Sequence, residues 1–428
     1  MKKVLKIIGF GLLGLILVAF GGLYIAYHTF SPGDKGIPVN EENLVYFQES
    51  YDDCRNAFLA EADNVLAKFN QGRLFSVRVP SKVDQELFTD FIYIPPLADT
   101  TKLLVLSSAV HGIEGYAGSA VQQMFLKEMV NEDLLNKMGI LIIHAVNPYG
   151  FKYGRRVTEN NVDLNRNSEV NPALFQTKND GYLTLIDMLN PEGEVSEGNL
   201  RSQFFYLIAI SKMLKESMSV LRQAVLQGQY EIPDGIYFGG TDFEPQIDSM
   251  TAILPGIFKP YEQILEIDLH TGYGARRVLH LFSNPVDDPE IKAKTEAIFT
   301  GHPIDWGDKA DFYVISGGFA SSYLGKLNPE AEYLNMAFEW GTFDSQKTLG
   351  SLQSISRVIN ENQGIHYGYK NERQEKKVKL SSKEMYYSDS GAWRSEVIRS
   401  GREMLKLVVI TFPDVEIPVI HSSSFKIN

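Results

Sequence analysis

The sequence predicts an α/β fold: a three-layer α/β/α sandwich with a mixed, largely parallel sheet, preceded by one N-terminal transmembrane helix. Two observations predict the sandwich. Strand-like and helix-like runs alternate along the body of the chain, and the first two strand-like runs, at residues 103–106 and 140–143, are short and fully apolar. Such runs are typical of strands that are covered by helices on both faces of a sheet. A third observation, the apolar N-terminus, predicts the transmembrane helix.

The predicted strands and helices follow one another along the chain. Apolar runs predict strands at residues 103–106, 140–143, 264–267, 278–282 and 334–338, and a last strand at 405–412. The spacing of apolar residues predicts helices at 49–69, 117–130, 203–227 and 289–299. These elements account for the α/β assignment, because the helices fall between successive strands.

The first thirty residues differ from the rest of the chain. Lys2, Lys3 and Lys6 precede an uncharged, mainly apolar run that continues to about residue 27. A helix needs about 20 such residues to cross a bilayer, whereas a signal-peptide core has roughly 7–15. The lysines favour a cytoplasmic N-terminus. We therefore expect a single-pass protein of the inner (plasma) membrane with its folded domain on the extracytoplasmic side; a cleaved signal peptide and a buried helix are the alternatives.

The domain organisation follows from this difference and from a polar break at Ser31-Pro32-Gly33. Residues 1–30 are predicted to be the membrane anchor and residues 31–48 a linker. Residues 49–415 are predicted to form one domain, and residues 416–428 a tail.

Composition limits the function classes. The net charge of −12 argues against a nucleic-acid partner, because binding to phosphates needs a basic face. Cys54 is the only cysteine, so a disulfide within the chain and a zinc site built from cysteines are both excluded. A metal site would have to use carboxylates and some of the eight histidines.

Two histidine motifs come directly after predicted strands. His111-Gly-Ile-Glu114 opens a helix, and a spacing of three residues puts both side chains on one side of a helical turn, where they can meet one metal ion. Asp268-Leu-His270-Thr-Gly ends another strand, with Asp268 as a possible acceptor behind the imidazole. Taken singly, each motif also fits an unremarkable alternative, namely a surface pair at a helix start and a core histidine.

Two further stretches carry polar groups suited to catalysis. The loop from Asn147-Pro-Tyr-Gly150 to Asp163-Leu-Asn-Arg-Asn167 holds several amides and three arginines, whose guanidinium groups match a carboxylate. Phe338-Glu339-Trp340 places an acid among apolar neighbours, where burial raises the pKa of a carboxyl towards that of a useful base.

Together these stretches resemble the zinc carboxypeptidase superfamily of carboxypeptidase A-like metallopeptidases. That superfamily has, in order, His-x-x-Glu, Asn-Pro-x-Gly, an arginine, Asp-x-Asn-Arg-Asn, a histidine and a late glutamate, and this sequence has all of them. The resemblance covers residues 75–345 directly. It is closest to a poorly characterised bacterial branch with an Asp-Leu-His-Thr-Gly element. The fold it implies is a zinc carboxypeptidase-like sandwich.

The resemblance also implies a metal and a mechanism. One Zn²⁺ per chain is expected, held by His111, Glu114 and His270. Glu339 corresponds to the general base, which takes a proton from the attacking water. Arg156 corresponds to the arginine that stabilises the oxyanion of the transition state.

Substrate binding is implied in the same way. Asn165 and Arg166 correspond to the pair that binds the terminal carboxylate of a substrate, and Arg155 is an alternative to Arg156 as the oxyanion donor. A tyrosine that caps the substrate has no clear match, with Tyr237 and Tyr273 as the only candidates. The long interval between Glu114 and His270 predicts an insertion within residues 168–245.

The expected activity is that of a membrane-anchored, zinc-dependent carboxypeptidase-like hydrolase, which cleaves an amide bond next to a free carboxylate. Two alternatives remain open at this stage. One is an N-acyl amino acid deacylase of the aspartoacylase or succinylglutamate desuccinylase type, and the other is a non-catalytic binding protein on the same fold. The expected partners are thus a peptide or N-acyl amino acid and the membrane, and the sequence does not fix the oligomeric state.

Overall fold

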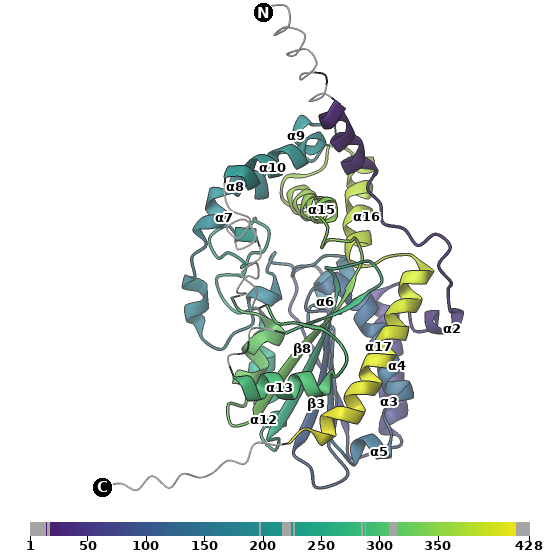
Figure 1. Ribbon diagram of the computed structural model, residues 1–428. Coiled ribbons are helices and arrows are strands. Elements are labelled where there is room, and N and C mark those ends of the chain that lie inside the picture. The colour runs from purple at the N-terminus through teal and green to yellow at the C-terminus, as the bar shows by residue number, and fades with distance from the viewer. Residues whose placement is uncertain are drawn as a thin grey trace, which may run out of the picture.

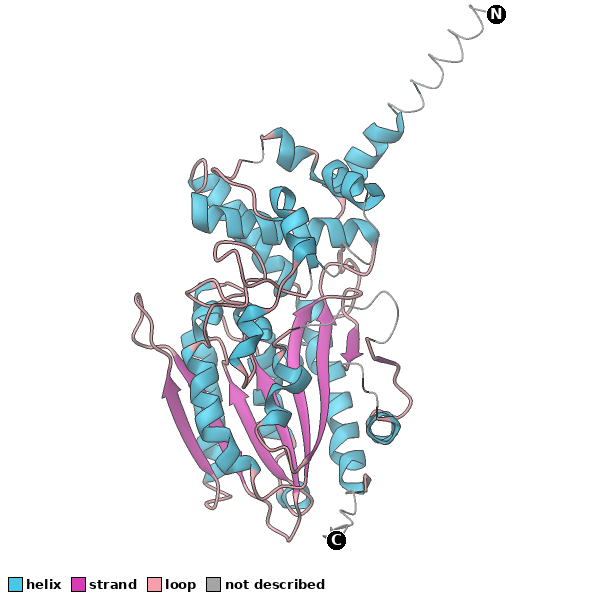
Figure 2. Cartoon of the chain, turned by 90° about the vertical axis from the view of Figure 1, so that its left-hand side faces the viewer, coloured by secondary structure: helices cyan, strands magenta, loops and turns pink. Residues whose placement is uncertain are grey.

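The computed structural model describes residues 14, 18–196, 198–215, 224–225, 227–283, 286, 288–307 and 316–416, and all structural statements below concern these residues. One eight-stranded sheet in the order β1-β2-β4-β3-β5-β8-β6-β7 forms the centre of the molecule (Figure 2). The mixed α/β sheet with helices that the sequence predicts is therefore present.

The strands at the centre of the sheet are parallel. The eight strands are β1 (Arg73–Arg78), β2 (Phe88–Ile94), β3 (Lys102–Ser108), β4 (Gly139–His144), β5 (Gln263–Gly272), β6 (Leu279–Phe282), β7 (Ile304–Asp305) and β8 (Glu332–Gly341). The pairs β4–β3, β3–β5 and β5–β8 are parallel, and so is β6–β7. Antiparallel pairing joins β1 to β2, β2 to β4 and β6 to β8. Five of the predicted strands are confirmed, since they lie in β3, β4, β5, β6 and β8.

Helices cover both faces of the sheet (Figure 1). One face packs on α3 (Tyr51–Leu66), α4 (Gly115–Glu128), α13 (Pro289–Ile298) and α17 (Gly391–Thr411), and the other on α12 (Pro245–Phe258) and α14 (Leu324–Lys326). Each face has its own cluster of buried apolar side chains, with Leu104 and Leu106 of β3 on the first side and Leu103 and Val105 on the second. This alternation is what a strand with two covered faces produces. The helices predicted at 49–69, 117–130 and 289–299 are confirmed.

A second group of helices lies beyond one end of the sheet, at the top of Figure 1. It comprises α7 (Asp180–Thr184), α8 (Ile186–Leu189), α9 (Leu200–Gln203), α10 (Phe205–Lys215), α15 (Thr348–Tyr367) and α16 (Glu372–Tyr386). Buried side chains of α7, α8, α10 and α15 form a separate apolar cluster. The helix predicted at 203–227 is confirmed as far as Lys215, and residues 216–223 and 226 of that range lie outside the described residues. Four of these helices fall within the predicted insertion at 168–245.

Shorter elements connect the strands to these helices. They are α2 (Glu41–Leu44), α5 (Glu132–Leu135), α6 (Pro148–Tyr153), η1 (Gly112–Glu114), η2 (Leu164–Arg166), η3 (Pro172–Gln176), η4 (Phe319–Tyr323) and η5 (Phe412–Asp414). In Figure 2 the tips of the central strands point towards the second helical group. Because η1 and η2 lie in the connections at this end, side chains from distant parts of the sequence meet there.

The strand predicted at 405–412 is wrong, because this segment belongs to α17 and η5. Leu405, Val408 and Phe412 are fully buried, at intervals of three and four residues that match one face of a helix. The β-branched residues of this segment favour a strand locally, but the packing of that face against the sheet decides the outcome.

The predicted membrane anchor at residues 1–30 is also wrong. Across the described part of the chain, no helix combines the length and apolar character that crossing a bilayer requires. Residues 1–13 and 15–17 lie outside the described residues, as do residues 417–428 of the predicted tail. The single-pass topology, the inner-membrane location and the membrane partner that depended on this helix are therefore unsupported.

The helix of residues 18–29 contacts the second helical group. Tyr27 is 4% exposed, and its ring centroid lies 5.1 Å from that of Tyr206 in α10. The amide of Gln353 in α15 donates a hydrogen bond to the carbonyl of Tyr27. These contacts tie the N-terminal helix to the part of the molecule that lies beyond the strand ends.

Candidate metal centre

Three predicted metal ligands converge at the carboxyl ends of β3 and β5. His111 follows β3 in the turn before η1, Glu114 ends η1, and His270 lies near the end of β5. One ligand atom from each lies within 4.8 Å of the other two. All three side chains are buried, with exposed fractions of 5%, 2% and 4%. The structure thus brings together residues that are as much as 159 positions apart, from His111 to His270.

Local backbone geometry explains how η1 reaches this position. Ala109 has a left-handed φ of 59°, which turns the chain sharply after β3. A Cβ at Gly112 would lie 2.2 Å from the backbone of Gly150, so only glycine allows η1 to approach α6 this closely. The N–H groups of Gly112 and Ile113 donate to the carbonyls of Arg156 and Arg155, at 3.1 and 2.9 Å. These bonds hold the His-x-x-Glu turn against the turn that carries the arginines.

Glu114 faces both imidazole rings. Its Oε1 lies 2.9 Å from Nδ1 of His111, and its Oε2 lies 2.9 Å from Nδ1 of His270. The backbone N–H of Thr271 donates to Oε2 at 3.1 Å, and the two ring centroids are 4.8 Å apart. Burial alone would raise the pKa of Glu114, but the two histidines lower it to about 2. The carboxylate is therefore ionised throughout the physiological range.

Each histidine has an aspartate behind it. Nε2 of His270 lies 2.5 Å from Oδ2 of Asp268, and Nε2 of His111 lies 3.4 Å from Oδ1 of Asp163. Burial would lower the pKa of His270, but Asp268 and then Glu114 raise it well above its ordinary value. Both aspartates are fully buried. An acceptor at Nε2 favours the tautomer with the proton there, which leaves Nδ1 able to bind a cation.

This arrangement fits a divalent cation. Two imidazole nitrogens and a carboxylate face one point. The outer nitrogen of His270 is bound by Asp268 and that of His111 faces Asp163, as is typical of histidines that bind a metal. Two histidines and one glutamate form a donor set that zinc prefers, with a fourth position left open for water or substrate. The sulfur of Cys54 takes no part, since Cys54 lies on α3 and is buried in the core.

The two candidate oxyanion arginines have different surroundings. Nε of Arg156 donates to Oδ2 of Asp163 at 3.1 Å, and Nη1 lies 3.8 Å from Oε1 of Glu114. Arg155 instead donates to Glu361 at 2.9 Å and to Asn161 at 3.1 Å. The side chain of Arg156 therefore borders the metal centre, whereas that of Arg155 joins α15 to the loop that carries Asn161.

Glu339 lies beside the metal centre on β8. It is half-buried and pairs with His270 in the parallel ladder between β5 and β8. The backbone N–H of Tyr273 donates to its Oε1 at 2.8 Å. Burial, followed by the charge of Glu114, raises the pKa of Glu339 to about 8. A carboxyl with a pKa near neutrality can both accept and return a proton.

The predicted carboxylate-binding pair, Asn165 and Arg166, lies in η2. Arg166 is 2% exposed, and its guanidinium lies 5.9 Å from the ring centroid of Tyr237, which also faces the guanidinium of Arg156 at 5.5 Å. The side-chain oxygen of Asn165 accepts a hydrogen bond from the N–H of Phe319 at 2.8 Å. A space of about 20 Å³ borders Arg156, Tyr237 and other residues of this region, which is room for about one water molecule.

Sequence reasoning assigned no role to several residues of this centre. Asp163 was recognised only as part of a motif, although it contacts both His111 and Arg156. Tyr386 lies far away in the sequence but lines the same small space, and its carbonyl accepts a hydrogen bond from Thr271 at 2.6 Å. No local pattern around Tyr386 could have indicated this, because a helix of the second group brings it to the site.

Comparison with known proteins gives a family and a set of remote structural relatives. The family described as "Protein of unknown function (DUF2817)" matches residues 47–400. No curated protein matches the chain. Solved structures that resemble it include bovine thrombin-activatable fibrinolysis inhibitor in complex with tick carboxypeptidase inhibitor, carboxypeptidase A from Helicoverpa armigera and an aspartoacylase family protein from Mesorhizobium loti.

These structural likenesses are distant. The bovine protein is 11% identical, with 84% of this chain and 99% of that chain covered and a TM-score of 0.41. The corresponding values are 13%, 78%, 73% and 0.39 for the H. armigera enzyme, and 14%, 71%, 69% and 0.33 for the M. loti protein. Carboxypeptidases and aspartoacylase relatives are thus among the structures that this chain resembles, as the sequence motifs predict.

Proposed function

Because this chain belongs to the DUF2817 family, whose description names no activity, we propose from its own side chains that it is a zinc-dependent hydrolase that cleaves an amide bond next to a free carboxylate. One observation carries the proposal. Nδ1 of His111 and Nδ1 of His270 each lie 2.9 Å from the carboxylate of Glu114, with an aspartate behind each ring.

His111, Glu114 and His270 would hold the metal ion. Zinc bound there would supply Lewis acidity, lowering the pKa of water to ~7 and polarising the substrate carbonyl. Asp163 and Asp268 would orient the two rings, because each accepts or faces the outer nitrogen of one imidazole.

Glu339 is the proposed general base. Its pKa of about 8 suits a group that takes a proton from water and passes it to the leaving amine. The hydrogen bond from the N–H of Tyr273 orients one oxygen of this carboxylate. The position of Glu339 opposite His270 in the ladder supports this role.

Arg156 is the proposed oxyanion donor. Its Nη1 lies 3.8 Å from Glu114 at the edge of the metal centre, and Asp163 fixes its Nε. A guanidinium in this position can donate to the oxygen that becomes negative during attack on the carbonyl. Arg155 is not proposed for this role, since Glu361 and Asn161 hold it.

Asn165 and Arg166 are the proposed binding residues for the substrate carboxylate. Arg166 is close enough to Tyr237 that the ring covers its guanidinium, and the same ring covers Arg156. A substrate carboxylate would therefore enter beside Tyr237 and meet the planar fork of the guanidinium, which suits two-point binding.

A second candidate is hydrolysis of N-acyl amino acids, and the enclosure of the site favours it over long peptides. Arg166 is 2% exposed, and the space beside Arg156 is about 20 Å³. A small acyl amino acid needs less rearrangement of the covering helices than a polypeptide does. Both substrates share the free carboxylate, so they draw on the same proposed residues.

The full-length protein, loaded with zinc, is the material for the test. Peptides with a free C-terminus, the same peptides with an amidated C-terminus, and N-acyl amino acids should be compared at equal concentration. We expect turnover of substrates with a free carboxylate only. Equal cleavage of the amidated peptides would remove the carboxylate requirement, and it would do so whichever acyl group is preferred.

Metal analysis separates an enzyme from a binding protein. His270→Ala should lose the bound zinc, and the exposed His302→Ala should keep about one zinc per chain as the matched control. If the parent protein binds zinc through His270 but hydrolyses none of the substrates, the non-catalytic alternative gains support. If it binds no zinc at all, the hydrolase proposal fails.

A further inference from the structure

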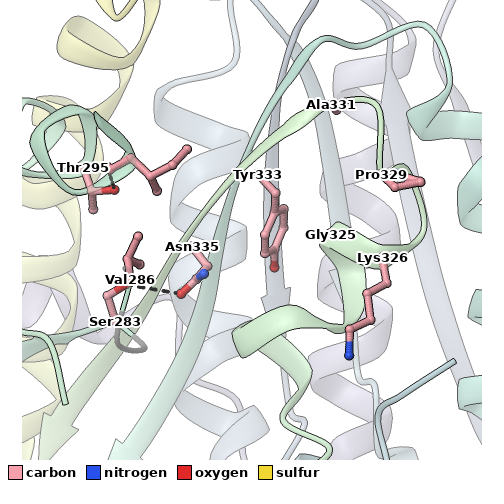
Figure 3. Close-up of a pocket in the computed structure, with 10 residues that line it drawn as sticks. Ser283, Val286, Thr295, Gly325, Lys326, Pro329, Ala331, Tyr333 and Asn335 are labelled. Carbon is pink, nitrogen blue, oxygen red and sulfur yellow. Dashed lines mark hydrogen bonds between the residues drawn. The ribbon is translucent and has the colours of Figure 1, made fainter. Parts of the chain in front are cut away.

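A chain of hydrogen-bonding side chains runs along one face of the sheet from a surface pocket to His270. The pocket has a volume of about 400 Å³, and Figure 3 shows the phenol of Tyr333 standing between Asn335 and the Gly325–Lys326 segment at its wall. The hydroxyl of Tyr333 donates to Oε2 of Glu266. From there the contacts continue through Ser107 and Asp268 to the imidazole.

The geometry of this chain follows from the strand pairing. Ser107 Oγ lies 3.3 Å from Oε1 of Glu266 and 2.8 Å from Oδ1 of Asp268. Asp268 Oδ2 lies 2.5 Å from Nε2 of His270. Glu266, Asp268 and His270 alternate along β5, so their side chains point to one face, and Ser107 of β3 pairs with Asp268. Ser107, Glu266 and Asp268 are fully buried.

Counting protons gives the direction of the hydrogen bonds. Ser107 has one hydroxyl proton and can donate one hydrogen bond. Its contact with Asp268 is shorter than its contact with Glu266, so the hydroxyl donates to Asp268. The oxygen of Ser107 then presents a lone pair to Glu266, which must be protonated to donate to it. An ionised Glu266 would be a buried charge facing that lone pair, and among the described residues no cation forms an ion pair with it. Burial, followed by the charge of Asp268, raises the pKa of Glu266 well above its ordinary value, in agreement with a neutral carboxyl.

The two histidines are thus supported in different ways. Asp163, behind His111, is balanced by the cation of Arg156, whose Nε donates to it at 3.1 Å. Asp268, behind His270, instead accepts a hydrogen bond from the hydroxyl of Ser107. The His270 side of the centre therefore depends on a neutral hydrogen-bonded chain rather than on an opposite charge.

We propose that Ser107 and Glu266 are positioning residues of the metal centre, which fix Asp268 and through it the ring orientation and tautomer of His270. This inference rests on the proposed role of His270 as a metal ligand. Oδ1 of Asp268 accepts a hydrogen bond from Ser107, and Oδ2 accepts one from Nε2–H of His270. Nδ1 of His270 therefore keeps its lone pair for the cation. Neither residue belongs to the three proposed ligands, so both would act only through Asp268.

The test measures zinc affinity in the full-length chain by competition with a chromophoric chelator. Partners of a metal-binding histidine typically contribute 10–100-fold in affinity. We expect Ser107→Ala and Glu266→Leu to weaken zinc binding about 10-fold and to shift the visible spectrum of the cobalt(II)-loaded protein. Glu266→Gln should stay within about 2-fold of the parent, because a neutral amide still accepts from Tyr333 and donates to Ser107.

Ser108→Ala is the matched control. Ser108 is the next residue on β3, is equally buried, and donates instead to Gln122 at 2.9 Å. It should leave both affinity and spectrum unchanged. Parent-like affinity in folded Ser107→Ala and Glu266→Leu would overturn the inference, as would a Glu266→Gln variant as weak as Glu266→Leu. Those results leave the hydrolase proposal standing if His270→Ala still abolishes zinc binding, whereas a parent that binds no zinc removes both.

Discussion

His270 and Glu339 occupy partner positions on the neighbouring parallel strands β5 and β8. A proposed metal ligand and a proposed base are therefore held by the hydrogen-bonded ladder and not by mobile connections. Because parallel strands end at the same edge of a sheet, the reacting groups are fixed relative to one another before any substrate binds.

Glu339→Gln tests the base directly. We expect hydrolysis to fall about 10²–10⁴-fold, because the amide cannot accept the proton, while zinc content stays at the parent value. Turnover with saturating substrate and metal analysis check both points. Glu330→Gln, an exposed position shortly before β8, is the control and should behave as the parent. Unchanged turnover in Glu339→Gln would exclude Glu339 as the base.

Arg156→Lys and Arg155→Lys separate the two arginines. Arg156→Lys keeps a positive charge beside Asp163 but loses the planar guanidinium. The kcat should therefore fall about 10²-fold, in the range seen for loss of an oxyanion donor. Arg155→Lys should keep most of kcat and instead lower the melting temperature, since Arg155 links Glu361 and Asn161. The reverse pattern would assign the oxyanion role to Arg155.

Removal of the metal should be reversible. A chelator should abolish hydrolysis, and added zinc should restore it, because the three ligands come from separate elements that the sheet keeps in place. Zinc at about 100 times its dissociation constant adds about 2.7 kcal/mol to the stability of the folded state, so the melting temperature should rise by a few degrees. The His270→Ala variant should show no such rise. A rise of equal size in that variant would place the stabilising zinc elsewhere.

The lowered pKa of Asp90 predicts that the fold loses stability in acid. Its carboxylate is fully buried and accepts two hydrogen bonds from Arg55, at 2.8 and 3.0 Å. Burial would raise the pKa of Asp90, but nearby His144, with Nδ1 3.8 Å away, and the hydrogen bonds from Arg55 lower it to about 2, below the ~3.9 of an unfolded chain. This carboxylate therefore stabilises the fold above about pH 4, and the contribution is lost as the pH falls towards 2.

Denaturant unfolding of the parent and of Asp90→Asn between pH 7 and pH 3 checks this. The variant should be less stable by on the order of 2 kcal/mol at pH 7, and the difference should shrink as the pH falls. The exposed Asp99→Asn is the control, and its stability should stay close to that of the parent. A difference between parent and Asp90→Asn that is constant with pH would contradict the linkage.

The sheet was largely predictable because its central strands are buried on both faces. Runs such as 103–106 and 140–143 are apolar throughout and admit few other structures. The segment 405–412 is also mainly apolar and rich in β-branched residues but lies in a helix, because tertiary packing of one helical face outweighs local preference. The edge strand β1, its neighbour β2 and the helices α15 and α16 were not foreseen, since their patterns are weaker.

The metal centre was predictable where its residues form short motifs. The spacing of His111 and Glu114 and the order of the later motifs led to the cluster that the structure brings together. Ser107, Glu266 and Tyr386 could not be found in this way, because strand register and helix packing bring them to the site. Asp268 was noted as a possible acceptor, and its 2.5 Å contact with His270 fulfils that expectation.

The contact between Tyr27 and Tyr206 has a practical consequence for work with shortened chains. A version that starts at residue 31 would uncover the slot that Tyr27 fills and would leave the amide of Gln353 without its carbonyl partner. The helices over the strand ends would lose part of their support, although every proposed ligand was retained. Truncations should therefore begin no later than residue 18, or the loss of activity that follows will be mistaken for a defect in chemistry.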